Sequence, residues 1–185
     1  MQEVREQEVR VPGASVFMGR SLWTAAQNWT CPPSSYVLCQ RLSDGHPPLQ
    51  LRFDRTVRQE VYPRVRALGF MPSAGSITMQ PLGQPLRTLN CWFDVDQFET
   101  ATDMDASAWH ALSGDFMPVT SRNLEAMMQR MHHELTRPGF GSDQVIEAAN
   151  LIQAIANSKM GALYQPNTNT GKGWKETRVK PEFFK

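Results

Sequence analysis

The stretch "LRTLNCWFDV", residues 86–95, decides the fold that the sequence predicts. Its residues alternate in two sets. One set is Arg87, Leu89, Cys91 and Phe93, and the other is Thr88, Asn90, Trp92 and Asp94. A period of two places the two sets on opposite faces of a β-strand. The stretch therefore predicts a half-buried strand.

The chain before this strand repeats the pattern between turns. Leu49, Leu51 and Phe53 alternate with polar residues, as a second strand would. Further short strands are expected at residues 64–71 and 77–79, and another begins at 36–39 and runs to the next turn. Gly- and Pro-rich turns are expected at 43–48, 72–75 and 81–83. Short strands at this spacing are typical of a sandwich or small barrel, and a double-sheet jelly roll is the favoured version.

After Asp96 the period changes to that of helices. A short helix is expected at 105–112, and Ser121 can cap a second helix. The apolar positions of the second helix form one buried stripe, made of Leu124, Met127, Met128, Met131 and Leu135. Pro138-Gly139 ends it, and Ser142 or Asp143 starts a third helix that runs to about residue 163.

These patterns predict an α+β fold, with an N-terminal antiparallel β jelly roll followed by two or three C-terminal helices that form a helical hairpin. The predicted division is an N-terminal arm at 1–34, a β domain at 35–100, a helical dimerisation segment at 101–164 and a linker or disordered tail at 165–185.

Composition narrows the function classes. The net charge is +1, from 19 basic and 18 acidic residues, so the chain lacks the basic surplus of a DNA-binding domain. Three cysteines without a Cys-x-x-Cys pair indicate neither a zinc ribbon nor a disulfide framework, and they are expected as free thiols. The charged N-terminus is unlike a signal peptide, and no apolar run is long enough for a membrane span. A cytoplasmic location is expected.

No pattern predicts catalysis. His132 and His133 are adjacent, so they lie about 100° apart around a helix and cannot both bind one ion. The second histidine of a His-Glu-x-x-His motif is missing, and residues 49–95 contain no histidine that could hold a metal inside a barrel. Asp94 and Asp96 could form a carboxylate pair, but such residues are far more often a solvated strand exit or a helix cap. We expect no catalytic residue, no metal, no cofactor and no enzymatic activity.

Two segments resemble a known family. Residues 67–98, "ALGFMPSAGSITMQPLGQPLRTLNCWFDVDQF", and residues 124–156, "LEAMMQRMHHELTRPGFGSDQVIEAANLIQAIA", resemble the N-terminal domains of AraC/XylS-family bacterial transcription regulators. The matching residues are Pro72, Ala74, Gly75, Arg87, Leu89, Cys91, Phe93, Asp94, Phe98 and the Pro-Gly-Phe hinge at 138–140. The turn Pro-Ser-Ala-Gly departs from that family's tighter Pro-Ala-Gly.

The resemblance implies a cupin-like domain that senses a small effector inside its barrel and dimerises through its C-terminal helix. DNA would then be bound only by a helix-turn-helix domain that does not follow in this chain. The pocket candidates are Tyr36, Leu38, Phe53, Leu89, Trp92 and Phe93, which core packing would explain equally. The candidates for the homodimer interface are Ile152, Ile155 and Met160.

Two other functions stay open. A small cupin-type enzyme would contain bound iron, zinc or manganese. A carbohydrate-binding sandwich would use Trp23, Trp29 or Trp92 as a stacking platform.

Overall fold

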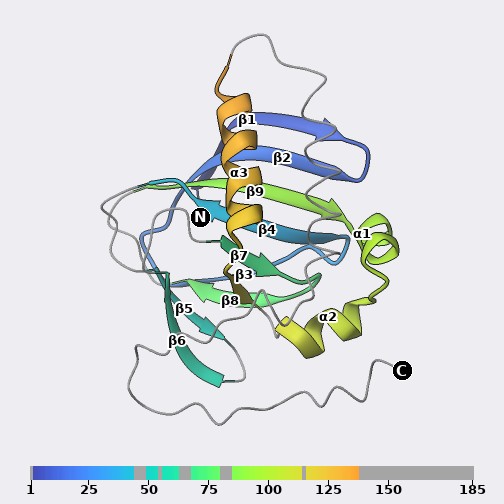
Figure 1. Ribbon diagram of the computed structural model, residues 1–185. Helices are drawn as coiled ribbons and strands as arrows, with labels where there is room; N and C mark the ends of the chain where they lie inside the picture. The colour runs from blue at the N-terminus through green and yellow to red at the C-terminus, as the bar shows by residue number, and fades with distance from the viewer. Residues whose placement is uncertain are drawn as a thin grey trace.

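The computed structural model describes residues 2–43, 49–53, 56–62, 68–79, 85–113 and 116–137 (Figure 1). Within these ranges the chain forms two antiparallel sheets and three helices. The six-stranded sheet has the order β1 (Gln2–Val11), β2 (Ala14–Leu22), β9 (Leu86–Asp94), β4 (Ser35–Arg41), β7 (Leu68–Met71) and β10 (Met117–Val119). The four-stranded sheet has the order β3 (Gln27–Thr30), β8 (Ser76–Met79), β5 (Leu49–Phe53) and β6 (Thr56–Tyr62). The helices are α1 (Val95–Thr102), α2 (Ala106–Ser113) and α3 (Arg122–Leu135).

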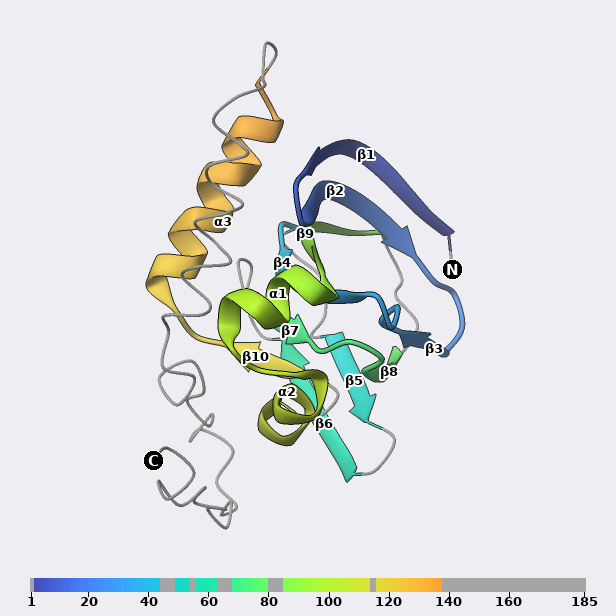
Figure 2. The same ribbon diagram turned by 90° about the vertical axis from the view of Figure 1, so that its right-hand side faces the viewer.

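The six-stranded sheet is the middle layer of the molecule. Figure 2 shows α3 on one side of it and β3 and β8 on the other. We call the side toward the helices the helix face and the side toward the four-stranded sheet the inner face. One core cluster joins the helix face to Phe98, Trp109 and the buried side of α3. A second cluster joins the inner face to Ile77 and Met79 of β8. Each face of the sheet is therefore covered by its own apolar layer.

The alternation predicted in β9 is confirmed. Leu89, Cys91 and Phe93 are buried in the cluster on the helix face. Trp92 packs against the cluster on the inner face. Both faces of this strand are covered, because one apolar cluster lies against each side of the sheet.

The first 34 residues are not the arm that the sequence predicts. β1 and β2 form a hairpin on the six-stranded sheet, and β3 belongs to the four-stranded sheet. Pro12 and Gly13 make the hairpin turn, and Gly13 adopts a φ of 75° that glycine accepts without steric cost. A Cβ at Gly13 would also collide with the side chain of Gln97 at the start of α1.

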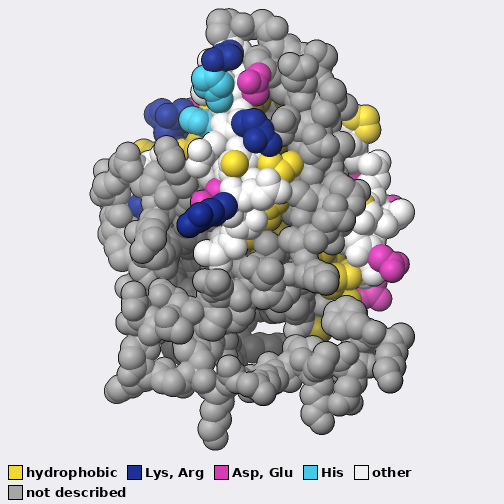
Figure 3. Space-filling view, viewed as in Figure 1, with side chains coloured by type: hydrophobic (Ala, Val, Ile, Leu, Met, Phe, Trp, Pro, Cys, Tyr) yellow, Lys and Arg dark blue, Asp and Glu magenta, His cyan; other side chains and the backbone are white. Residues whose placement is uncertain are grey.

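The predicted helix after Ser121 is confirmed as α3. Ser121 caps it by accepting a hydrogen bond from the Leu124 N–H. Its buried positions are the predicted stripe: Leu124, Met127, Met128, Met131 and Leu135. The opposite side of α3 is exposed, and Figure 3 shows arginine and histidine side chains gathered there. This polar side is what an amphipathic helix presents to solvent.

Three features near the helices differ from the sequence prediction. α1 was not predicted, and its N-cap is Asp94, which accepts from the Gln97 N–H at 3.2 Å. β10 was not predicted either, and it pairs with β7 at the sheet edge. α2 begins at Ala106, one residue from the expected start. The expected third helix at 143–163, with Ile152, Ile155 and Met160, lies outside the described residues.

The coarse fold class is as predicted: an antiparallel β region followed by a few helices. Among the described strands none pairs with members of both sheets, so these ranges form no closed barrel. In the part of the chain that the structure describes, no helix is long and apolar enough to cross a membrane. The cytoplasmic location stays a prediction.

Candidate functional site

Four of the predicted pocket residues lie on the helix face. Tyr36, Leu38, Leu89 and Phe93 are each at most 1% exposed and belong to the core cluster under the helices. The Tyr36 hydroxyl donates to Glu99 Oε1 at 2.6 Å, which fastens α1 to β4. Burial, together with this carboxylate, raises the pKa of Tyr36. These residues hold the helix layer on the sheet.

The other two predicted residues do not complete a pocket with them. Trp92 lies on the inner face, opposite to its neighbours Cys91 and Phe93. β5 includes the backbone of Phe53, but the Phe53 side chain lies outside the described part of the structure. The expectation that one pocket collects all six residues is therefore corrected, because the strand alternation divides five of them between two layers.

The inner face carries a group of polar side chains that sequence analysis did not select. Arg41 is only 7% exposed and Asn90 only 9% exposed. Arg41 pairs with Thr88 across β4 and β9, and the Asn90 side-chain amide donates to the Thr88 hydroxyl at 2.9 Å. We call Arg41, Thr88 and Asn90 the inner polar group. It places a guanidinium, a hydroxyl and an amide beside one another on a mostly apolar face.

Aromatic rings extend this face toward β2 and β3. The Trp92 ring meets Phe17 at a centroid distance of 5.7 Å and Trp29 at 6.4 Å, both edge to face. The Arg5 guanidinium stacks over the Phe17 ring, 4.2 Å from its centroid, as in a cation–π contact. Trp29 and Trp92 are half-buried, so part of each ring is open to solvent. The inner polar group therefore has an aromatic neighbour in Trp92.

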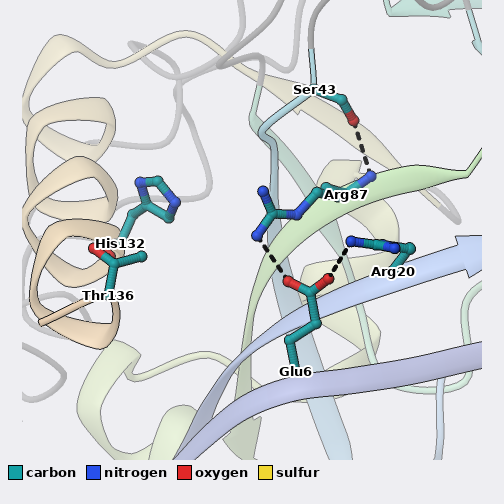
Figure 4. A network of polar contacts seen from close by, with 6 residues as sticks. All are labelled: Glu6, Arg20, Ser43, Arg87, His132 and Thr136. Carbon is teal, nitrogen blue, oxygen red and sulfur yellow. Dashed lines mark hydrogen bonds and ion pairs between the residues drawn. The ribbon is translucent and has the colours of Figure 1, made fainter. Parts of the chain in front are cut away.

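A second polar group lies on the helix face, at the C-terminal end of α3 (Figure 4). Glu6 accepts from Arg87 at 2.7 Å and from Arg20 at 2.9 Å, so one carboxylate joins three strands. These contacts, with the Arg87 hydrogen bond first among them, hold the pKa of Glu6 below its usual value. His132 of α3 points toward Arg87. Burial and the Arg87 charge lower the pKa of His132.

Nothing in the described residues assembles a catalytic set. The His110 Nε2–H donates to the Ser73 carbonyl at 2.7 Å, which ties α2 to the turn after β7. No group of three His, Cys, Asp or Glu side chains within the described ranges could hold a metal ion. Burial raises the pKa of the Cys31 thiol to about 12 and also raises that of Cys91, so neither is an activated nucleophile. Two polar clusters of the described residues thus remain, the inner polar group and the group of Glu6, Arg20 and Arg87.

The sequence carries a signal for the inner polar group. Thr88 and Asn90 alternate with the buried Leu89 and Cys91 in β9, and Arg41 is the last residue of β4. Polar residues at central positions of a strand that is covered on both faces are the informative ones.

No protein-family model matches the chain. Two curated proteins are similar to part of it. The cytochrome c′ of Rhodocyclus tenuis is 51% identical over 57 residues, which are 31% of this chain and 43% of that protein. The cytochrome c′ of Allochromatium vinosum is 60% identical over 45 residues, which are 24% of this chain and 29% of that protein. The chain therefore matches less than half the length of either relative.

One solved structure is similar in fold, a "putative mannose-6-phosphate isomerase" from Ralstonia eutropha JMP134. It has a TM-score of 0.39 and 12% identity, and the match covers 50% of this chain and 85% of that one. A likeness of this size supports no conclusion about function.

The predicted function, an effector-sensing domain of an AraC-type regulator, is wrong. The two curated proteins that match are cytochromes c′, and neither is a transcription regulator.

The residues of this chain do not fit the covalent haem site of a cytochrome c. That site needs a Cys-x-x-Cys-His segment. The three cysteines are Cys31, Cys39 and Cys91, and none is followed three residues later by another cysteine. We therefore derive no chemistry through haem.

Proposed function

We propose that the β region is a non-catalytic binding domain that holds a small anionic molecule at the inner polar group. The observation that carries the proposal is the burial of Arg41 and Asn90 on the inner face, where Thr88 is the cross-strand partner of Arg41 and accepts from Asn90. A buried guanidinium, with its fork of N–H donors, suits a carboxylate or phosphate group. The Asn90 amide and Thr88 hydroxyl add donors beside it.

The strand order supports a jelly roll as the frame of this site. The eight strands β2–β9 divide into β2-β9-β4-β7 in one sheet and β3-β8-β5-β6 in the other, and neighbouring strands of the described ranges pair antiparallel. Eight antiparallel strands in two facing sheets are the jelly-roll architecture, which cupins share. In such a fold the space between the sheets is where a small ligand lies, and the inner polar group faces that space.

The aromatic residues suggest what the rest of the ligand contacts. Trp92 lies two residues beyond Asn90 on the same face of β9 and is half-buried. Its ring contacts Trp29 from the opposite sheet. A ligand with a carboxylate at Arg41 and an apolar or planar body against Trp92 would satisfy both surfaces.

Thermal unfolding of the full chain with acetate, benzoate and inorganic phosphate tests the proposal. A ligand at one hundred times its Kd stabilises the folded state by about 2.7 kcal/mol. For a chain of this size that raises the Tm by about 5–11 °C. Arg41→Gln should abolish the rise, and Thr88→Val, at a half-exposed position, should weaken it. The control Arg122→Gln removes an exposed arginine of α3 and should leave the rise unchanged.

A dose-dependent Tm rise that Arg41→Gln leaves intact would remove the inner polar group from the proposal. If none of the three anions shifts the Tm, the anionic ligand class is wrong.

A further inference from the structure

Among the described strands, β1 is an edge of the six-stranded sheet. Of these strands it pairs only with β2, and Figures 1 and 2 show it at the outer margin of the sheet. Val4, Arg5, Gln7, Glu8 and Arg10 are all exposed, and Val4, at 50%, is the exposed large hydrophobic residue of the described chain. An edge strand presents a row of backbone N–H and C=O groups to another chain.

The register of β1 contains one irregularity. Arg5 pairs with Gly19 and Gln7 pairs with the adjacent Met18, so Glu6 is an extra residue in the strand. Such a bulge leaves its residue outside the ladder. Val4 and Val9 are opposite Arg20 and Val16 of β2, which share one face, although Val4 and Val9 stand five positions apart in the sequence. Arg5 and Glu8 share the other face, because they are opposite Gly19 and Phe17.

We infer that β1 is the interface of a homodimer, in which two copies of the strand pair antiparallel about a two-fold axis at Gln7. Counted in ladder steps from Gln7, Arg5 and Glu8 are each one step away, Val4 and Val9 two steps, and Glu3 and Arg10 three steps. A two-fold axis therefore sets each member of a pair opposite the other member in the second copy.

The resulting pairs are complementary in charge and in polarity. In this register Arg5 stands opposite Glu8 of the second copy, Glu3 opposite Arg10, and Val4 opposite Val9, and the symmetry makes each pair twice. Within one copy Glu8 also pairs with Arg5 at 3.2 Å and with Arg10 at 3.0 Å. Members of each pair lie on the same face of the sheet, as antiparallel pairing requires. Charges on an edge strand usually prevent pairing with another strand. Here their order attracts a second copy of the same strand and repels a shifted register.

The first test compares Val4→Lys with Ala126→Lys by sedimentation equilibrium of the full chain. Both positions are exposed, and Ala126 lies on the outer side of α3. Loss of two valine pairs should weaken the dimer by about 2- to 30-fold in Kd, from the usual worth of cross-strand pairs. Ala126→Lys should leave the Kd unchanged. A wild-type chain that is monomeric at its highest soluble concentration overturns the inference.

The second test is a charge swap. Arg10→Glu sets glutamate against Glu3 of the second copy, and against Glu8 of its own copy, which Arg10 contacts at 3.0 Å, and it should weaken the dimer. Glu3→Arg combined with Arg10→Glu should restore it. The two positions are six ladder steps apart, about 20 Å along one strand, so they cannot interact within one copy. Rescue by the double variant thus reports a contact between copies. A dimer indifferent to both variants uses another surface, and the inference fails.

The proposed anion site is independent of this result. Arg41, Thr88 and Asn90 lie in the inner layer, so the dimer variants should keep the anion-dependent Tm rise whatever their oligomeric state.

Discussion

Phe98 fastens the helix layer to the six-stranded sheet, and its truncation gives the sharpest test of the fold. The side chain is fully buried. Four rings surround it, at centroid distances of 4.7 Å for Tyr36, 5.2 Å for Phe93, 5.3 Å for Trp109 and 5.8 Å for Phe70. Phe98→Ala removes the ring from all four and leaves a cavity between α1 and the sheet.

The expected loss of stability is large. Buried Phe→Ala substitutions cost about 3–5 kcal/mol through lost transfer free energy and the remaining cavity. With a urea dependence of about 2 kcal/mol per M, the midpoint of unfolding should fall by about 2 M. Urea titration followed by tryptophan fluorescence measures this, since Trp109 lies against Phe98.

Gln97→Ala is the matched control, because Gln97 is the exposed neighbour in the same helix. Its effect should stay within about 0.5 kcal/mol. If Phe98→Ala costs less than about 1 kcal/mol with an unchanged slope, the aromatic cluster does not anchor the helices and the packing argument is refuted.

Three further predictions concern a turn, a cap and a titration. Gly13→Ala should destabilise the chain by about 1–2 kcal/mol or more, because φ is positive and the new Cβ collides with the Gln97 side chain. In urea titrations, adding Gln97→Ala should recover only the stability lost to that collision, because the positive φ remains. Ser121→Ala should cost about 1 kcal/mol through the lost cap of α3, while Ser121→Asp should be nearly neutral by the same measurement. The pKa of His132 is lowered in the folded state, by burial and then by Arg87. The neutral imidazole therefore stabilises the fold above the ordinary histidine pKa of about 6.5. The free energy of unfolding should fall as the pH drops below that value. Urea titrations at several pH values should show a smaller fall for His132→Gln, and an identical fall would contradict a lowered pKa of His132 in the folded state.

The parts of the fold that sequence predicted have a local period. β9 and α3 alternate with periods of two and 3.6, and the structure has both at the expected places. What a period cannot give is the identity of the layer on each side. Tyr36 and Leu38 share a face, but whether helices or a second sheet cover it depends on the topology of the whole chain.

β1 was missed for two physical reasons. Its sequence is mostly charged, because an edge strand buries little. Its apolar residues Val4 and Val9 stand five apart, which breaks the period of two, and the extra residue Glu6 is what restores their common face. α1 was missed because Asp94 is both the last residue of β9 and the N-cap of α1, so no turn separates the two elements. Only the strand showed a clear hydrophobic period in the sequence.

The residues of the inner polar group could have been predicted from the sequence, whereas the function could not. Arg41 and Asn90 stand at covered positions of two predicted strands, which a search for polar residues among apolar ones would have selected. The regulator prediction instead came from a resemblance in the turn at 72–75 and the helix after Ser121. These features serve packing and capping in this chain, so they describe how it folds more than what it binds.

Glu6 illustrates how chain length alone can encode a contact. Deleting it would leave Arg5 and Gln7 consecutive, and every other residue of β1 would keep its partner in β2 and its face. The deletion would remove only the carboxylate that joins Arg20 to Arg87. A single inserted codon can thus add a crosslink between strands without disturbing a neighbouring residue, and a single deletion can take it away.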